Sequence, residues 1–213
     1  MPVHVQTERF RIHKVVASQY GNNAYVIVCK ATGESVIVDT PQEAAKVIAE
    51  ARGTRVRAIL ITHQHADHLE GFEQVKEATK AAAAIHYEDA AAMPGKPDFY
   101  LTDGDIIPVG HLALQVIHTP GHTPGATCLL LEDHLFTGDT LFPGGPGRTS
   151  SNAELRQSIE SITKKLYRLP DDTRVYPGHG DDTTIGQSKA EYAVFASKQH
   201  ASDLSGDVVW MTS

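Results

Sequence analysis

The stretch from Ile61 to His68 places four side chains that can bind a metal within six positions. It is Ile-Thr-His-Gln-His-Ala-Asp-His, so the candidates are His63, His65, Asp67 and His68. Imidazole nitrogens and carboxylate oxygens are common protein ligands of zinc and of other divalent metals. A single histidine after a strand is usually an ordinary residue, whereas crowding of this kind strongly predicts a metal site.

Three further candidates follow at His122, Asp139 and His179. They lie in Thr-Pro-Gly-His-Thr-Pro-Gly, Thr-Gly-Asp-Thr and Pro-Gly-His-Gly, each directly after an apolar segment. Glycine beside each of them lets the backbone turn sharply and approach a site closely. Two divalent ions need about four to five ligands each, including a carboxylate that bridges them, and the seven residues supply such a set. The remaining histidines are interpreted as ordinary residues: His4, His13, His86, His111, His118, His134 and His200.

Apolar segments that predict strands lead into the candidate ligands. One of them covers residues 56–61, before the histidine-rich stretch, and a strand that ends in a loop can hold ligands rigidly. Turn-forming residues such as glycine and asparagine separate these segments. The expected strands cover residues 10–16, 24–29, 35–38, 56–61, 85–87, 106–109, 112–117, 126–131, 134–137 and 174–176.

Four helices are expected among these strands. Thr40 as N-cap, with Glu43 three residues on, is a capping box that predicts the first of them. Similar N-cap patterns open the third and the fourth, whereas residues 90–99 contain proline and glycine and are expected to be irregular. The helices are expected over residues 40–51, 69–80, 151–169 and 184–198.

The order of strands and helices predicts an α/β (α+β) fold, a four-layer αββα sandwich. No low-complexity linker interrupts the chain, so a single domain is expected over residues 1–202, followed by a C-terminal tail over residues 203–213.

The composition is that of an ordinary globular protein of 213 residues, with 41% hydrophobic and 21% charged residues. The net charge of −7 argues against a general nucleic-acid or membrane-surface binder. No apolar run approaches the ~20 residues of a membrane span, and no signal peptide is recognised, so a cytoplasmic location is expected. Cys29 and Cys128 lie in apolar segments and are expected to be inert core thiols. The oligomeric state stays open.

The pattern His-x-His-x-Asp-His at positions 63–68 resembles the signature of the metallo-β-lactamase fold superfamily. Residues 119–125, 137–142, 147–149 and 177–180 are similar to the glyoxalase II-like (hydroxyacylglutathione hydrolase-like) branch in its short, single-domain form. The resemblance covers nearly the whole chain. It implies that one metal ion is held by His63, His65 and His122, a second by Asp67, His68 and His179, and that Asp139 bridges the two.

The resemblance implies a metal-dependent hydrolase that cleaves a small-molecule thioester, such as an acyl-glutathione-type conjugate, by a metal-bound hydroxide. Asp67 is then the catalytic residue that orients this hydroxide. The implied cofactor is a pair of divalent ions, with zinc preferred and iron or manganese as alternatives. Arg148 is expected to bind a substrate carboxylate as a bidentate fork, although a salt bridge that fixes the preceding loop fits equally well. Asp39, at the end of a strand, is a candidate to anchor the second nitrogen of a ligand imidazole.

Three other functions share these motifs. A persulfide dioxygenase would use one iron held by His63, His122 and Asp139, and a lactonase would share the two-metal site. A metal-binding interaction module without turnover is the non-enzymatic alternative, and a broken ligand set would mark it. All seven positions are intact. Longer glyoxalase II enzymes carry a C-terminal helical domain that completes the substrate site, whereas one helix and a tail are expected after His179.

Overall fold

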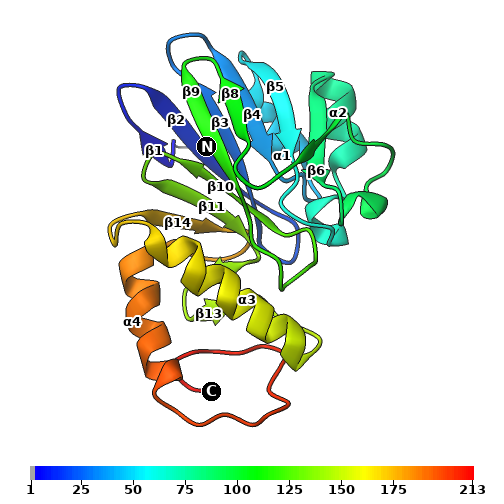
Figure 1. The fold of residues 1–213 in the computed structure, drawn as a ribbon. Coiled ribbons are helices and arrows are strands. Elements are labelled where there is room, and N and C mark those ends of the chain that lie inside the picture. Colours follow the sequence, from blue (N-terminus) through cyan, green and yellow to red (C-terminus); the bar gives the residue numbers. More distant parts are fainter. Residues whose placement is uncertain (1–2) are drawn as a thin grey trace.

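Two mixed β-sheets lie face to face in the centre of the computed structural model, which describes residues 3–213 (Figure 1). The first sheet contains, in this spatial order, β1 (Val5–Gln6), β2 (Phe10–Ala17), β3 (Asn22–Cys29), β4 (Glu34–Val38), β5 (Arg55–Leu60), β6 (Ala82–His86) and β7 (Phe99–Leu101). The second contains, in order, β15 (Thr183–Thr184), β14 (Arg174–Pro177), β11 (His134–Gly138), β10 (Thr127–Leu131), β9 (Leu112–His118) and β8 (Ile106–Val109). A short hairpin of β12 (Leu141–Phe142) and β13 (Gly145–Pro146) contacts the second sheet.

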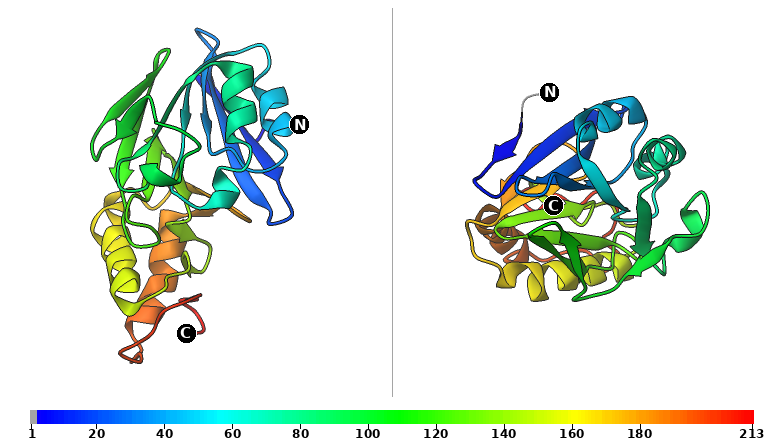
Figure 2. Two further views of the ribbon diagram at one scale, coloured as in Figure 1. Left: turned by 90° about the vertical axis from the view of Figure 1, so that its right-hand side faces the viewer. Right: turned by 90° about the horizontal axis from the view of Figure 1, so that it is seen from above.

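Helices cover the outer face of each sheet, so the molecule has four layers (Figures 1 and 2). α1 (Ala44–Ala51) and α2 (Phe72–Thr79) pack on the first sheet, and α3 (Asn152–Lys164) and α4 (Ile185–Ala196) pack on the second. Single 3-10 turns are η1 (Ala66–His68), η2 (Ala90–Ala92) and η3 (Leu166–Arg168). The predicted αββα sandwich is confirmed. None of the helices within residues 3–213 is both long and apolar enough to cross a membrane.

The apolar side chains of β3 show how the layers are held together. Val26 and Val28 point to the cluster between the first sheet and its helices, whereas Tyr25 and Ile27 point to the cluster between the two sheets. All eight residues of β3 are buried. Because successive side chains of a strand point to opposite faces, a strand buried on both faces appears in the sequence as one continuous apolar run.

The strands bring the candidate ligands to one end of the sandwich. His63 follows β5, His122 follows β9, Asp139 follows β11 and His179 follows β14. Strands β11 and β14 are parallel neighbours, so their carboxyl ends, and the residues that follow them, lie at the same edge. An isolated bridge between Asn22 and His179 joins this edge to the first sheet.

The helix predicted from Thr40 begins four residues later. The backbone N–H and the hydroxyl of Thr40 both donate to the carbonyl of His68, at 2.9 and 3.2 Å, so this side chain does not cap a helix. Glu43 occupies the N-cap position instead, with a left-handed φ of 65° and no side-chain cap. The capping-box prediction is therefore wrong here, and Thr40 fixes the loop that carries the candidate ligands.

The segment over residues 203–213, expected to be a tail, contains no helix or strand but packs against the second layer of helices. Trp210 is fully buried, with its ring 5.2 Å from that of Tyr192 and 6.4 Å from that of Tyr167. Its backbone N–H donates to the carbonyl of Gly144 at 2.8 Å. Burial of this large apolar ring holds the segment in place.

Candidate metal centre

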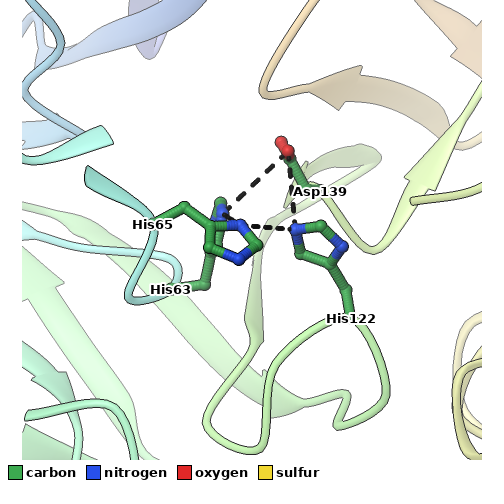
Figure 3. A group of neighbouring side chains, drawn as sticks. All are labelled: His63, His65, His122 and Asp139. Carbon is green, nitrogen blue, oxygen red and sulfur yellow. Dashed lines mark hydrogen bonds and ion pairs between the residues drawn. The ribbon is translucent and has the colours of Figure 1, made fainter. Parts of the chain in front are cut away.

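Four of the candidate ligands form a first group at the end of the sandwich to which β5, β9 and β11 lead. Figure 3 shows that His63, His65, His122 and Asp139 point toward one another, and one ligand atom from each lies within 4.8 Å of the others. The Nδ1 atom of His65 lies 3.1 Å from Nε2 of His63 and 2.9 Å from Nε2 of His122. The Oδ2 atom of Asp139 lies 3.9 Å from Nε2 of His63 and 3.6 Å from that of His122.

Asp67, His68 and His179 form a second group with the same spacing limit. The Nε2 atoms of His68 and His179 are 3.3 Å apart, and Oδ2 of Asp67 lies 3.2 Å from the latter. Asp139 reaches this group as well, since its Oδ1 lies 3.4 Å from Nε2 of His68 and its Oδ2 lies 3.6 Å from Nε2 of His179. The carboxylate therefore lies between the two groups, where a bridging ligand would have to be.

The outer nitrogens of the rings fix which nitrogen faces the centre. His122 donates from Nδ1 to the carbonyl of Arg148 at 2.8 Å, and His179 donates from Nδ1 to the carbonyl of Tyr20 at 3.1 Å. His68 donates from Nδ1 to Oδ2 of Asp39 at 2.9 Å. A neutral imidazole that donates through one nitrogen carries a lone pair on the other. Because the Nδ1 atoms are engaged in these bonds, the inward Nε2 atoms are the ones that would bind a metal.

The centre fits a cation better than it fits internal hydrogen bonding. Two lone pairs that face each other at about 3 Å repel unless a proton or a cation lies between them. Oδ1 of Asp139 is buried, and no donor among the described residues forms a hydrogen bond with it. A Cβ atom at Gly178 would clash with this oxygen and with the ring of His68, so only glycine fits there. The donor set and the unsatisfied carboxylate oxygen fit divalent metal ions.

The ionisation states of the residues in the centre also favour a bound cation. Burial, and then the neighbouring imidazoles, hold the pKa of His63 well below its usual value. Burial would raise the pKa of Asp139, but the imidazoles of His68, His63 and His122 lower it. Hydrogen bonds from His179 and Asn22 lower the pKa of Asp67. Both carboxylates are therefore ionised at neutral pH, which is the form that binds a cation.

Asp39 lies behind the second group, where it anchors His68. It is 2% exposed and also accepts two hydrogen bonds from Thr62, at 2.8 Å from the backbone N–H and 2.8 Å from the hydroxyl. The hydroxyl of Thr62 thereby accepts from Nδ1 of His63 at 3.0 Å. One buried carboxylate thus orients a ring in each group.

Replacing Asp39 with alanine is expected to weaken metal binding about 10- to 100-fold, because His68 loses the acceptor that orients it. Metal affinity would be measured by competition with a chromophoric chelator. The Asp39→Asn variant keeps an acceptor for Thr62 and is expected to lie between Asp39→Ala and the native protein. The Asp172→Ala variant, at an exposed aspartate, serves as the control. Native affinity in Asp39→Ala would contradict the anchoring role.

Arg148 contributes its backbone, rather than its side chain, to the first group. Its carbonyl accepts from His122, whereas its side chain is 75% exposed and has its Nε 3.8 Å from Oδ2 of Asp207. The side chain lines a cleft that opens beside His122 and His179. Substrate binding by this guanidinium stays a prediction.

Two buried residues of the centre were not singled out from the sequence. Asn22 is fully buried and donates from Nδ2 to Oδ2 of Asp67 at 2.8 Å. Asp89 is fully buried and accepts from the backbone N–H groups of Gln64 and Gly125, at 3.0 and 2.8 Å, and from the hydroxyl of Thr123 at 2.6 Å. Asp89 therefore ties the loop of His63 and His65 to the loop of His122. An aspartate at a strand end, followed by alanines, carries no motif that would reveal this role.

A third cluster, of His86, Glu88 and His118, does not have the geometry of a metal site. The two imidazoles are stacked, with ring centroids 4.0 Å apart and an angle of 10° between their planes. A metal ion lies close to the plane of each imidazole that binds it, so nearly parallel stacked rings do not converge on one ion. Both histidines were interpreted from the sequence as ordinary residues.

Comparison with known sequences shows the family to which the chain is similar. A sequence model described as Metallo-beta-lactamase superfamily matches residues 18–179. The chain is 38% identical to a hydroxyacylglutathione hydrolase of Polaromonas sp. (strain JS666 / ATCC BAA-500) over 166 residues, which are 75% of this chain and 62% of that protein. It is 32% identical to the probable polyketide biosynthesis zinc-dependent hydrolase BaeB of Bacillus velezensis (strain DSM 23117 / BGSC 10A6 / LMG 26770 / FZB42) over 195 residues, covering 84% and 82% of the two chains. This chain thus spans less than two-thirds of the hydroxyacylglutathione hydrolase that it matches.

Solved structures share the fold. ETHE1 from Myxococcus xanthus superposes with a TM-score of 0.76 at 31% identity, over 88% of this chain and 85% of that one. TTHA1623 in a di-iron-bound form superposes with a TM-score of 0.72 at 29% identity, over 83% and 96% of the two chains. The resemblance inferred from the histidine-rich motif is therefore confirmed, and the names of relatives include both zinc and di-iron proteins.

Proposed function

Because this chain belongs to the metallo-β-lactamase superfamily, we propose that it is a metal-dependent hydrolase that cleaves a small thioester, such as an acyl-glutathione-type conjugate. The observation that carries the proposal is the position of Asp139 between two complete groups of ligands. The first metal would be held by His63, His65 and His122, the second by Asp67, His68 and His179, and Asp139 would bridge them. Zinc is the preferred ion, and the same donors accept iron or manganese.

When bound, two divalent ions lower the pKa of a water molecule and polarise the carbonyl of the substrate. Asp67 is ionised and partly exposed, with Asn22 donating to its Oδ2, so it can accept a hydrogen bond from the attacking water and orient it. A free thiol has a pKa of about 8.5, so a thiolate leaves without a strong general acid. This reaction therefore needs no further proton donor from the chain.

The completeness of the second group favours hydrolysis over the one-iron alternative. A dioxygenase that uses only His63, His122 and Asp139 would leave Asp67, His68 and His179 outside the set of metal ligands. Their ligand atoms nevertheless lie within 4.8 Å of one another, and Asp39 and Asn22 hold two of them in place. Such support is expected where a second ion must be positioned.

The proposal is tested with purified protein loaded separately with zinc, iron and manganese. Each form would be assayed with an acyl-glutathione thioester, an acyl-homoserine lactone and glutathione persulfide, the last with an oxygen electrode. Thioester cleavage without oxygen consumption is the expected result, and His63→Ala should abolish it while His111→Ala, at an exposed histidine, should not. Oxygen consumption on the persulfide without thioester cleavage would replace this proposal with a dioxygenase.

A further inference from the structure

A cleft of about 290 Å³ opens directly beside the metal centre. Its floor is formed by His122, Asp139 and His179. One wall is the proline- and glycine-rich loop over residues 142–148, which contains the end of β12 and all of β13, and the other is residues 207–209 of the C-terminal segment. Figure 1 shows this segment passing close to β13 below α3 and α4. A substrate that reaches the metals through this cleft must touch both walls.

The C-terminal wall is fixed in place at both of its ends. Gly206 and Thr149 exchange two backbone hydrogen bonds, at 2.8 and 3.2 Å. At the other end, Trp210 is fully buried and its backbone N–H bonds to Gly144. Between them, a Cβ atom at Gly145 would lie 2.6 Å from the carbonyl oxygen of Val208, so the two backbones are in direct contact. Residues 207–209 are therefore a structural part of the cleft.

The mouth of this cleft carries no excess positive charge. Arg148 is the one lysine or arginine among the described residues that line it, and Oδ2 of Asp207 lies 3.8 Å from its Nε. The side chains of the two residues are 75% and 83% exposed, so both face the solvent at the rim. The nearby surface is apolar, since Phe142 lines the cleft and Val209 is 44% exposed there.

From these contacts we propose that Asp207 sets the charge preference of the cleft. The cleft then accepts a thioester whose thiol portion, here called the thiol arm, is uncharged in preference to one whose thiol arm is anionic. The inference rests on the proposed thioester hydrolysis. Glutathione carries two carboxylates and one ammonium group, and its carboxylates must compete with Asp207 for Arg148. An N-acetylcysteamine arm is uncharged, and its methylene and methyl groups match the surface of Phe142 and Val209.

The test compares Asp207→Asn with Asp203→Asn, an exposed aspartate of the same segment that does not line the cleft. Binding to the metal-loaded protein would be measured by calorimetry with two thioethers that cannot be hydrolysed, S-propylglutathione and N-acetyl-S-propylcysteamine. KM and kcat would be measured with the propionyl thioesters of the same two thiols. Because an exposed ion pair contributes about 0.2–1 kcal/mol, Asp207→Asn should lower Kd and KM for the glutathione compounds about 1.4- to fivefold.

The expected pattern has three parts: native protein favours the uncharged arm, Asp207→Asn improves only the glutathione arm, and kcat is unchanged. A native preference for the glutathione arm would overturn the inference. So would equal gains for both arms, or the same gain in Asp203→Asn. If the thioethers follow the expected pattern while neither thioester is cleaved, the charge preference is supported and the proposed hydrolysis is wrong.

Discussion

Replacing Asp139 with alanine is expected to lower thioester hydrolysis by about a thousandfold or more and to reduce the metal content of each chain. The reason is geometric, because Asp139 is the one carboxylate within residues 3–213 whose two oxygens approach both ligand groups, at 3.4 Å from His68 and 3.6 Å from His122. Without it, each of the two proposed ions would lose a negatively charged ligand. Metal content would be measured by elemental analysis of dialysed protein, and hydrolysis by release of free thiol.

The matched control for this change is Asp172→Ala, which removes an exposed carboxylate that is not a candidate ligand. It should retain the native metal content and rate. Circular dichroism would show whether Asp139→Ala is folded, since the change also removes a buried charge. An Asp139→Ala protein with full metal content and full turnover would rule out the bridging role.

Replacing Asp89 with alanine is expected to lower the free energy of unfolding by about 3 kcal/mol, because one buried and one half-buried backbone N–H group then lose their acceptor. These belong to Gln64 and Gly125, on the two loops that carry the three histidines of the first ligand group. The loops should also lose their relative alignment, so metal affinity should fall about 10- to 100-fold. Urea denaturation of the apo form measures the first effect and chelator competition the second.

Two variants control for this change. Asp89→Asn keeps the volume and one carbonyl acceptor, so it should recover part of the lost stability. Glu88→Ala, at the exposed neighbour, should unfold at nearly the native urea concentration. If Asp89→Ala is as stable as Glu88→Ala and binds metal normally, the aspartate does not tie the two loops together.

The fold could be predicted because its strands and helices obey simple periodic rules. Strands buried on both faces, such as β3, leave continuous apolar runs, and the capping box of Ser151 and Glu154 marks the start of α3 as predicted. The candidate site was visible for a related reason. Its residues follow strands, either in the histidine-rich stretch after β5 or beside glycine at His122, Asp139 and His179. Their spacing can therefore be recognised locally in the sequence, even though the site is assembled from distant segments.

Features that depend on tertiary contacts could not be predicted. Thr40 has the sequence pattern of an N-cap, but its hydrogen bonds to His68 are possible only once the loop has folded against it. Residues 90–99 were expected to be irregular, yet Phe99 is the first residue of β7, which pairs with β6 in parallel. The polar C-terminal segment gives no periodic signal, and the burial of Trp210 depends on rings from α4 and η3.

Both cysteines are unpaired core thiols, as the sequence suggested, although the effect of burial on the pKa of Cys29 is outweighed by hydrogen bonds with Thr32 and His111, which lower it. They are free and buried, and they belong to different core clusters, Cys29 between the sheets and Cys128 beneath α3 and α4. Burial raises the pKa of the Cys128 thiol to about 11. A thiol with so high a pKa is a poor nucleophile and a poor metal ligand at neutral pH.

The number of metal ions per chain tests the central claim most directly. Apo protein would be titrated with zinc in the presence of a competing chelator, and bound metal would be counted by elemental analysis after gel filtration. The seven-residue centre predicts two ions per chain, with hydrolysis of a thioester appearing as the ions bind. A single ion at saturation, with the same occupancy when Asp67 or His179 is replaced by alanine, would contradict the two-metal centre.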